Sequence, residues 1–202
     1  MGEACSALFI RRPWRESFIE IESQNGYIES MISQGRGTMK SASNLLEGIG
    51  TGPLERVVVG KLGVDIDLLE GIRELVKKQK IRTGIILSAV GALSKAVFRN
   101  LKTVPANYKV DDRHRLYLEL EQPLEIVSLS GWIATKKDGE AEVHLHFSAS
   151  TVIKDQIVTL GGHLTPGTLT SVKVVVVVGV LADSTMKAST DPRTGQIDVD
   201  LS

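Results

Sequence analysis

The sequence predicts an α+β domain built on a largely antiparallel β-sheet, and two observations support this prediction. A single strong helical pattern, over about residues 66–80, stands among many short apolar or alternating segments. These segments are joined mostly by short turns such as Asp138-Gly139. Short turns connect antiparallel neighbours, whereas parallel strands need long crossovers. The patterns therefore favour an antiparallel sheet with one main helix after the first strand.

Residues 1–52 differ from the rest of the chain. Their apolar residues follow no sustained helical or alternating period, and Ser, Gly, Gln and Asn are frequent. We therefore predict a flexible or loosely docked extension over residues 1–52 and a folded domain over residues 53–202. Met39 offers an alternative start, which would make residues 1–38 dispensable.

The composition excludes several classes of protein. Lys and Arg together number 24 and Asp and Glu also number 24, so the balanced charge argues against a whole surface that grips DNA. The single cysteine, Cys5, has no partner for an internal disulfide, which indicates a cytoplasmic protein. No apolar run approaches the roughly 18 residues of a membrane span, and we expect no membrane association.

The main helix is predicted from its apolar spacing and its charges. Asp65 is the expected N-cap, and acidic residues come early and lysines late, as the helix dipole favours. One apolar face carries Ile66, Leu69, Ile72, Leu75 and Val76.

The remaining segments predict strands, and Gly91 is expected to turn the chain between the second and the third of them. Residues 116–120 alternate and predict a half-buried strand. The predicted strands cover residues 55–62, 82–90, 95–101, 116–120, 124–134, 142–150, 157–160, 170–181 and 196–201.

Three of the four histidines lie within twenty residues of one another. His144 and His146 are two apart in a predicted strand, so their side chains share a face, with Cα atoms about 6.5–7 Å apart. His163 follows Gly161-Gly162 beyond the next strand, where it could fold back beside the pair. Three imidazole nitrogens with an open position suit Zn, and nickel or iron less well. A polar cluster without an ion is the alternative that this pattern leaves open.

Other chemistries find less support. The sequence has no nucleophile elbow, no Walker A loop and no dinucleotide-binding glycine motif after a strand. Glu142 and Ser148 share the predicted histidine face and are candidates for contacts to the histidines. His114 lies in a charged loop and is expected to be exposed.

Five stretches, taken together, carry a resemblance to a known family. In order and approximate spacing, residues from about Leu54 to Leu201 resemble the plants-and-prokaryotes conserved (PPC) domain. The five stretches are Ser88-Ala89-Val90-Gly91-Ala92-Leu93, Leu124-Glu125-Ile126-Val127-Ser128-Leu129-Ser130-Gly131, Val143-His144-Leu145-His146, Gly161-Gly162-His163-Leu164 and Asp191-Pro192-Arg193-Thr194-Gly195.

The resemblance implies a mostly antiparallel fold assembled as a homotrimer. It also implies that His144, His146 and His163 bind a zinc-like divalent ion, as the matching residues do in prokaryotic members. In plants the domain accompanies AT-hook motifs in DNA-binding proteins and mediates protein contacts, which is why prokaryotic members are often named as DNA-binding candidates. Residues 34–37, Gln-Gly-Arg-Gly, lack the second arginine and the proline of an AT-hook, so the chain is similar to the metal-binding prokaryotic branch.

Three functional hypotheses follow. The first is a homotrimeric, metal-binding regulatory or interaction module with protein partners or DNA. The second is a zinc-dependent metalloenzyme acting on a small molecule, with no assigned catalytic residue and only Glu125 as a candidate acid or base. The third is a structural trimer whose histidines form a polar cluster without an ion.

Overall fold

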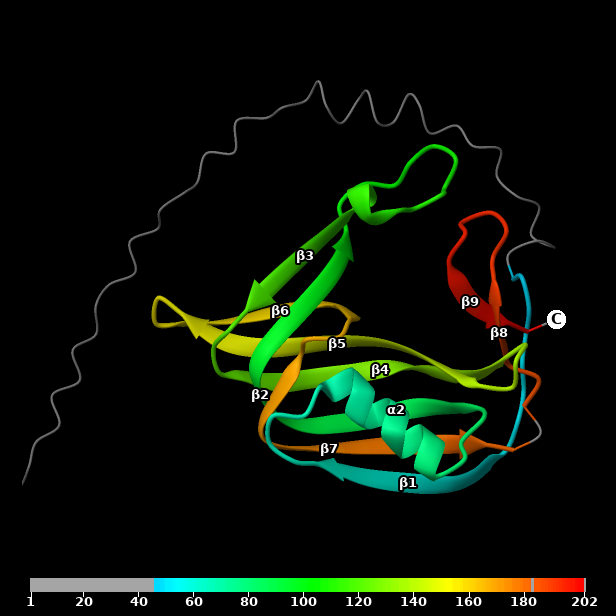
Figure 1. Ribbon diagram of the computed structural model, residues 1–202, viewed down its shortest axis with the longest axis horizontal. Helices are drawn as coiled ribbons and strands as arrows, with labels where there is room; N and C mark the ends of the chain where they lie inside the picture. The colour runs from blue at the N-terminus through cyan, green and yellow to red at the C-terminus, as the bar shows by residue number, and fades with distance from the viewer. Residues whose placement is uncertain (1–45, 183, 202) are drawn as a thin grey trace, which may run out of the picture. The chain divides into compact units, whose positions relative to one another are not determined.

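The computed structural model describes residues 46–182 and 184–201 of the 202-residue chain (Figure 1). Most of the predicted extension over residues 1–52 lies outside the described residues, together with Cys5 and Met39, so its flexibility stays a prediction. Residues 46–53 contain no helix or strand, and the first strand begins at Leu54. No helix within the described residues is long and apolar enough to cross a membrane.

The described part of the chain forms a mostly antiparallel sheet with one α-helix after the first strand, which confirms the predicted fold class. The elements are β1 (Leu54–Leu62), α2 (Leu68–Lys78), β2 (Gly84–Leu101), a 3-10 helix (Asp112–His114), β3 (Arg115–Leu120), β4 (Leu124–Lys136), β5 (Ala141–Ile153), β6 (Gln156–Leu164), β7 (Leu169–Leu181), β8 (Lys187–Thr190) and β9 (Ile197–Asp200).

The sheet is organised around β2. Its strand order is β1-β7-β2-β6-β5-β4-β8-β9, and β3 pairs with the outer half of β2. The first half of β2 pairs with β7 and β4, whereas its second half pairs with β3 and β6. Because β4, β5 and β6 pair in succession, the pairings β2-β4-β5-β6-β2 form a closed ring. Among the strand pairs described, only β4 with β8 is parallel.

Gly91 does not turn the chain, and the prediction of two strands separated at this residue is wrong. The chain runs through Gly91 as one strand of 18 residues. Gly91 has φ 155°, and a Cβ built on it would lie 2.3 Å from the carbonyl oxygen of Lys173 and 2.7 Å from the Cα of Val174. The glycine therefore allows β7 to approach β2 closely where the pairing register shifts.

The helix begins two residues later than predicted. Asp67, not Asp65, is the N-cap, and its Oδ1 accepts a hydrogen bond from the backbone N–H of Glu70 at 3.1 Å. Asp65 instead occupies the preceding turn with φ 55°, and Ile66 lies outside the helix and is 40% exposed. The other Asp67 oxygen accepts from the N–H of Gly167 at 2.6 Å, which ties the helix start to the turn before β7.

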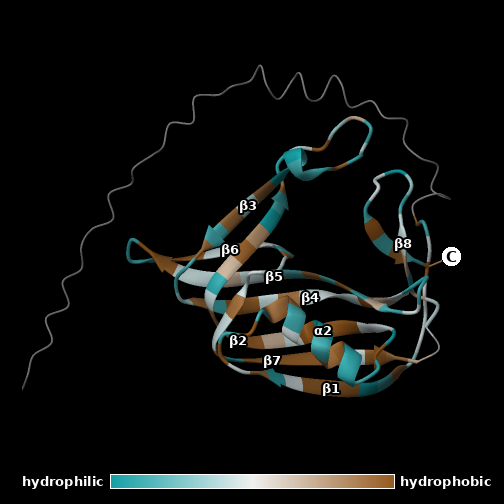
Figure 2. Ribbon diagram, in the orientation of Figure 1, coloured by the Kyte–Doolittle hydropathy of each residue, from teal (hydrophilic) through white to brown (hydrophobic). Residues whose placement is uncertain are grey.

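The core lies between α2 and one face of the sheet. Leu68, Leu69, Ile72 and Val76 of the helix are buried against alternate residues of the strands. In β5 the odd-numbered residues from Val143 to Thr151 are buried and the even-numbered residues lie on the other face. Figure 2 shows the resulting alternation of brown and pale segments along the strands.

The predicted half-buried strand at residues 116–120 is more exposed than expected. Leu116 and Leu118, in β3, are 57% and 40% exposed. The reason is topological, since β3 pairs only with the outer half of β2. Figure 1 shows this pair of strands extending away from the helix-covered part of the sheet.

We predict that Gly91→Ala lowers the free energy of unfolding by about 2–3 kcal/mol, because the added Cβ must displace the β7 backbone. Gly63→Ala is the matched control, since a Cβ there meets no atom within 4 Å, and its effect should stay within about 1 kcal/mol. Urea denaturation measures both values. Equal midpoints for the two variants would contradict the close approach of β7 to Gly91.

Candidate metal centre

Strand register brings the predicted histidines together. His146 on β5 pairs directly with His163 on β6, and directly paired residues place their side chains on the same face. His144 shares this face because it lies two residues before His146. The expectation that the three histidines converge is confirmed. The expected route is wrong in one respect, because His163 lies inside β6 and not beyond its end.

The three imidazoles form a compact cluster. One nitrogen from each of His144, His146 and His163 lies within 4.8 Å of the others. The Nδ1 of His163 is 3.4 Å from the Nε2 of His146. The ring of His163 stands nearly perpendicular to the other two, at 83° and 89°, with centroids 4.6 and 5.1 Å away. The ring of His163 is therefore edge-on to the rings of His144 and His146, and nitrogen atoms of all three rings lie around a common space.

This geometry fits a tetrahedral metal ion. Two nitrogens that each lie 2.0–2.1 Å from such an ion are about 3.4 Å apart. That separation matches the distance between His163 Nδ1 and His146 Nε2. The ligand atom of His144 lies within 4.8 Å of the other two. The residues present therefore suit a three-nitrogen site.

The protonation state of the cluster also suits a metal. Burial lowers the pKa of His163 to about 3, with smaller contributions from the nearby charge of Arg99 and from the other two histidines. Burial is also the main cause that lowers the pKa of His144 and of His146. All three imidazoles are then neutral at pH 7, which is the form that coordinates a metal.

Two neighbours of the cluster were missed by sequence reasoning. Trp132 pairs with His144 across β4 and β5, and the two rings stack with centroids 4.9 Å apart. Arg99 pairs with His163 across β2 and β6. Neither residue carries a local signal, since both belong to apolar strands. Only the pairing of distant strands identifies them.

Several sequence candidates lie elsewhere. Glu125 pairs with Ser150, four residues along β5 from His146, which is about 13 Å away along the strand. Ser148 shares a 2.8 Å hydrogen bond with Ser128, and Glu142 lies 4.0 Å from the Nζ of Lys136. The polar contacts of Ser148 and Glu142 therefore go to Ser128 and Lys136.

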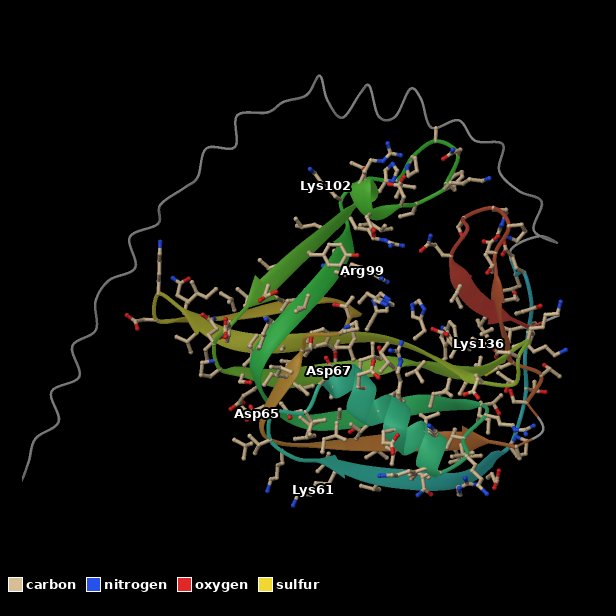
Figure 3. The ribbon with its side chains drawn as sticks, in the orientation of Figure 1. Lys61, Asp65, Asp67, Arg99, Lys102 and Lys136 are labelled. Atoms are coloured by element: carbon tan, nitrogen blue, oxygen red, sulfur yellow. The ribbon has the colours of Figure 1, made fainter. Side chains whose placement is uncertain are left out.

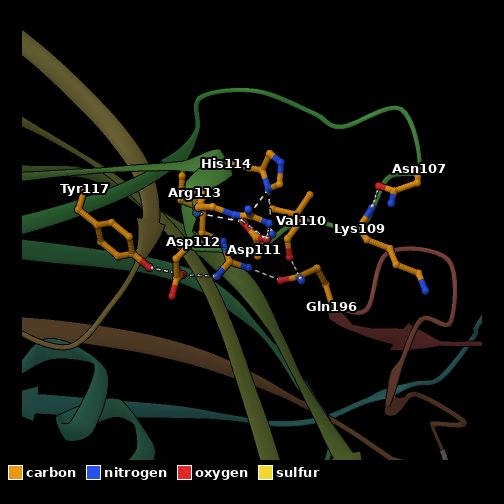
Figure 4. Close-up of polar contacts among 10 residues, drawn as sticks. Asn107, Lys109, Val110, Asp111, Asp112, Arg113, His114, Tyr117 and Gln196 are labelled. Carbon is orange, nitrogen blue, oxygen red and sulfur yellow. Dashed lines mark hydrogen bonds and ion pairs between the residues drawn. The ribbon is translucent and has the colours of Figure 1, made fainter.

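His114 is less exposed than expected, and it belongs to a polar network at the start of β3 (Figure 4). Its Nδ1 accepts a hydrogen bond from the backbone N–H of Asp111, whose carboxylate accepts from Arg113. Gln196 extends the network, because it donates to the carbonyl of Val110 at 2.9 Å. The β2–β3 pair is thereby linked to the turn before β9, and the fourth histidine takes no part in the cluster.

The model of the Plants and Prokaryotes Conserved (PCC) domain matches residues 49–182. The chain belongs to this family. The match covers the helix, the ring of strands and all three clustered histidines of this PCC-domain chain.

Solved structures share the PCC-domain fold. The metal-containing protein AF0104 from Archaeoglobus fulgidus is 25% identical, with a TM-score of 0.60 over 75% of this chain and 97% of that protein. A plant- and prokaryote-conserved (PPC) protein from Pyrococcus horikoshii is 20% identical, with a TM-score of 0.58 over 78% and 99%. A DNA-binding candidate from Bacteroides thetaiotaomicron is 17% identical, with a TM-score of 0.59 over 74% and 94%.

Curated relatives are longer proteins. The bifunctional protein GlmU of Synechococcus sp. strain JA-3-3Ab is 31% identical over 171 residues, and that of strain JA-2-3B'a(2-13) is 32% identical over 135 residues. These alignments include 85% and 67% of this chain but only 24% and 18% of the relatives. The chain thus spans about a quarter or less of their length.

Proposed function

We propose that this chain is a cytoplasmic, metal-binding PCC-domain module that holds a zinc-like divalent ion on His144, His146 and His163 and acts as a homotrimer in a regulatory or interaction role. The observation that carries the proposal is the convergence of three neutral imidazoles, two of them with nitrogens 3.4 Å apart. The similarity to the metal-containing protein of Archaeoglobus fulgidus supports it.

The chemistry of the donor set narrows the choice of ion. Imidazole nitrogens favour zinc, copper, nickel or iron over magnesium and calcium, which take oxygen ligands. A bound ion with three protein nitrogens would keep an open position and supply Lewis-acid character there. Trp132 packs on His144 and limits how that ring can turn. The alternative function is a zinc-dependent enzyme that uses this open position to act on a small molecule.

Homotrimer formation is supported by an exposed apolar patch on the sheet face opposite α2. Register places Val57 of β1, Gly179 of β7 and Ile85 of β2 in one cross-strand row. We call Val57, Val59, Ile85 and Leu87 the outer patch, and these side chains are 36–65% exposed. Contiguous exposed apolar surface of this kind marks protein interfaces, and we assign the outer patch to contacts between copies of this chain.

DNA binding is a second candidate, favoured by a basic hollow of about 760 Å³ between β1, β4, β7 and β8. Its lining contains six basic residues and two acidic residues, Glu55 and Asp200. Excess positive charge in one place is what contact with phosphates needs. The basic residues are Arg56, Lys80, Arg82, Lys136, Lys137 and Lys187.

We predict that protein purified without a histidine tag and supplied with zinc retains about one ion per chain. His163→Ala should weaken zinc binding by at least about a hundredfold, more than the loss of an outer-sphere partner does. His114→Gln is the matched control and should bind zinc as the wild type does. Mass spectrometry of metal content and competition with a chelator measure these effects. If the wild-type protein retains no metal, the proposed metal site is wrong and the histidines form a polar cluster without an ion.

Placing a charged residue in the outer patch tests the proposed homotrimer. Light scattering coupled to gel filtration should give three times the 21.9 kDa chain mass for the wild type. Val59→Glu places an acid in the apolar contact and should produce monomers, because burying an unpaired charge is costly. Val64→Glu adds the same charge at another exposed valine, outside the patch. A wild-type monomer, or equal masses for both variants, would exclude this interface.

DNA binding is tested by a mobility-shift titration of duplex DNA across salt concentrations. If the basic hollow contacts phosphates, Lys80→Gln with Arg82→Gln should reduce the slope of log affinity against log salt by about 2. Arg73→Gln, on α2 and away from the hollow, should leave the slope unchanged. Absence of a salt-dependent shift at micromolar protein would remove this candidate.

A further inference from the structure

Arg99 lies in a single row with the histidine cluster. Direct cross-strand pairing runs from Tyr117 on β3 to Arg99 on β2, to His163 on β6, to His146 on β5. Directly paired residues face the same side of a sheet, so the guanidinium of Arg99 shares the face of the imidazoles. Figure 3 shows Arg99 above the strands that carry the histidines. Its charge also contributes to the lowered pKa of all three histidines.

Within the described residues, the guanidinium of Arg99 lacks the carboxylate partner that most of the arginines have. Five of the seven arginines among residues 46–182 and 184–201 form ion pairs with a carboxylate. Arg82 and Arg99 do not, and of these two only Arg99 is half-buried. A half-buried, oriented cation without a carboxylate partner among the described residues is ready to take an anion from outside the chain.

We propose that Arg99 binds the carboxylate or phosphate group of a small anionic ligand and holds it against the metal position between the three histidines. The inference rests on the proposed metal site, because it assigns the class of ligand that this site takes. Tyr117 is a positioning residue. It pairs directly with Arg99 across β2 and β3, and its hydroxyl donates to Asp112 Oδ1 at 3.3 Å, so a fixed ring lies beside the guanidinium on the same face.

Electrostatics favours this arrangement over a purely structural ion. A fixed cation beside a divalent ion weakens metal binding, because like charges repel strongly where water is partly excluded. An anion between Arg99 and the ion is attracted by both and relieves this repulsion. The planar fork of an arginine donates two parallel hydrogen bonds to a carboxylate or phosphate. Arg99 can therefore bind an anion, and the bound anion offsets the repulsion between Arg99 and the metal ion.

The test uses inorganic phosphate and acetate as probes of the two anion classes. Metal content is measured first, and each anion is then titrated into zinc-loaded and metal-free protein by calorimetry. Arg99→Gln should raise the Kd of the bound anion about tenfold or more, because charged hydrogen bonds are lost. Arg73→Gln is the matched control, an arginine on α2. Arg99→Lys keeps the charge without the fork and should give an intermediate Kd.

The outcomes separate this inference from the proposed metal site. Anion binding that Arg99→Gln weakens and Arg73→Gln preserves supports the inference, and the tighter of the two probes identifies the ligand class. No anion binding, or equal binding by the wild type and both glutamine variants, overturns it while leaving the measured metal content to stand. If no metal is retained, the proposed function fails, and the titration of metal-free protein still decides whether Arg99 holds an anion. Circular dichroism checks that Arg99→Gln folds.

Discussion

The pairing of β2 with four other strands is the constraint on which the rest of the structure depends. Its first half lies between β7 and β4, and its second half lies between β3 and β6. A strand can change partners in this way only if it bends and shifts register, and Gly91 allows both at a point where any Cβ would meet β7. The bend brings Arg99, at the far end of β2, beside β6.

Register then determines which side chains can meet. A slip of one residue between β5 and β6 would move His163 to the opposite face from His146, because strand side chains alternate. The buried alternation of β5, with Leu145 and Phe147 in the core, opposes such a slip. Gly131 has φ 151°, and its built Cβ would lie 2.1 Å from the carbonyl oxygen of His144. This glycine keeps β4 against β5 beside the cluster, so core packing and close backbone contact together hold the imidazoles in place.

The parts of the site that sequence alone could predict are the local ones. The spacing of His144 and His146 required only that the segment be a strand, and the β5 pattern made that clear. The position of His163 could not be predicted from the sequence, because a double glycine permits either a close backbone approach or a φ above zero. In the structure β6 continues through both glycines, and a Cβ at Gly162 would lie 3.0 Å from the carbonyl oxygen of Arg99. Gly162 therefore allows β6 to lie close to β2. The place of Arg99 beside the cluster could not be predicted, because it lies 64 residues before its cross-strand partner His163 in the sequence.

The charges around the cluster act in opposite directions on protons and on metal ions. Burial and Arg99 both lower the pKa of the three histidines, which keeps the imidazoles neutral and available as ligands at pH 7. The same positive charge opposes a divalent cation, and Asp198 raises the pKa of His144 only as the smallest cause. A site selected only to hold a structural ion would gain from a carboxylate at the position of Arg99. An arginine there makes physical sense when a third, negatively charged participant completes the site.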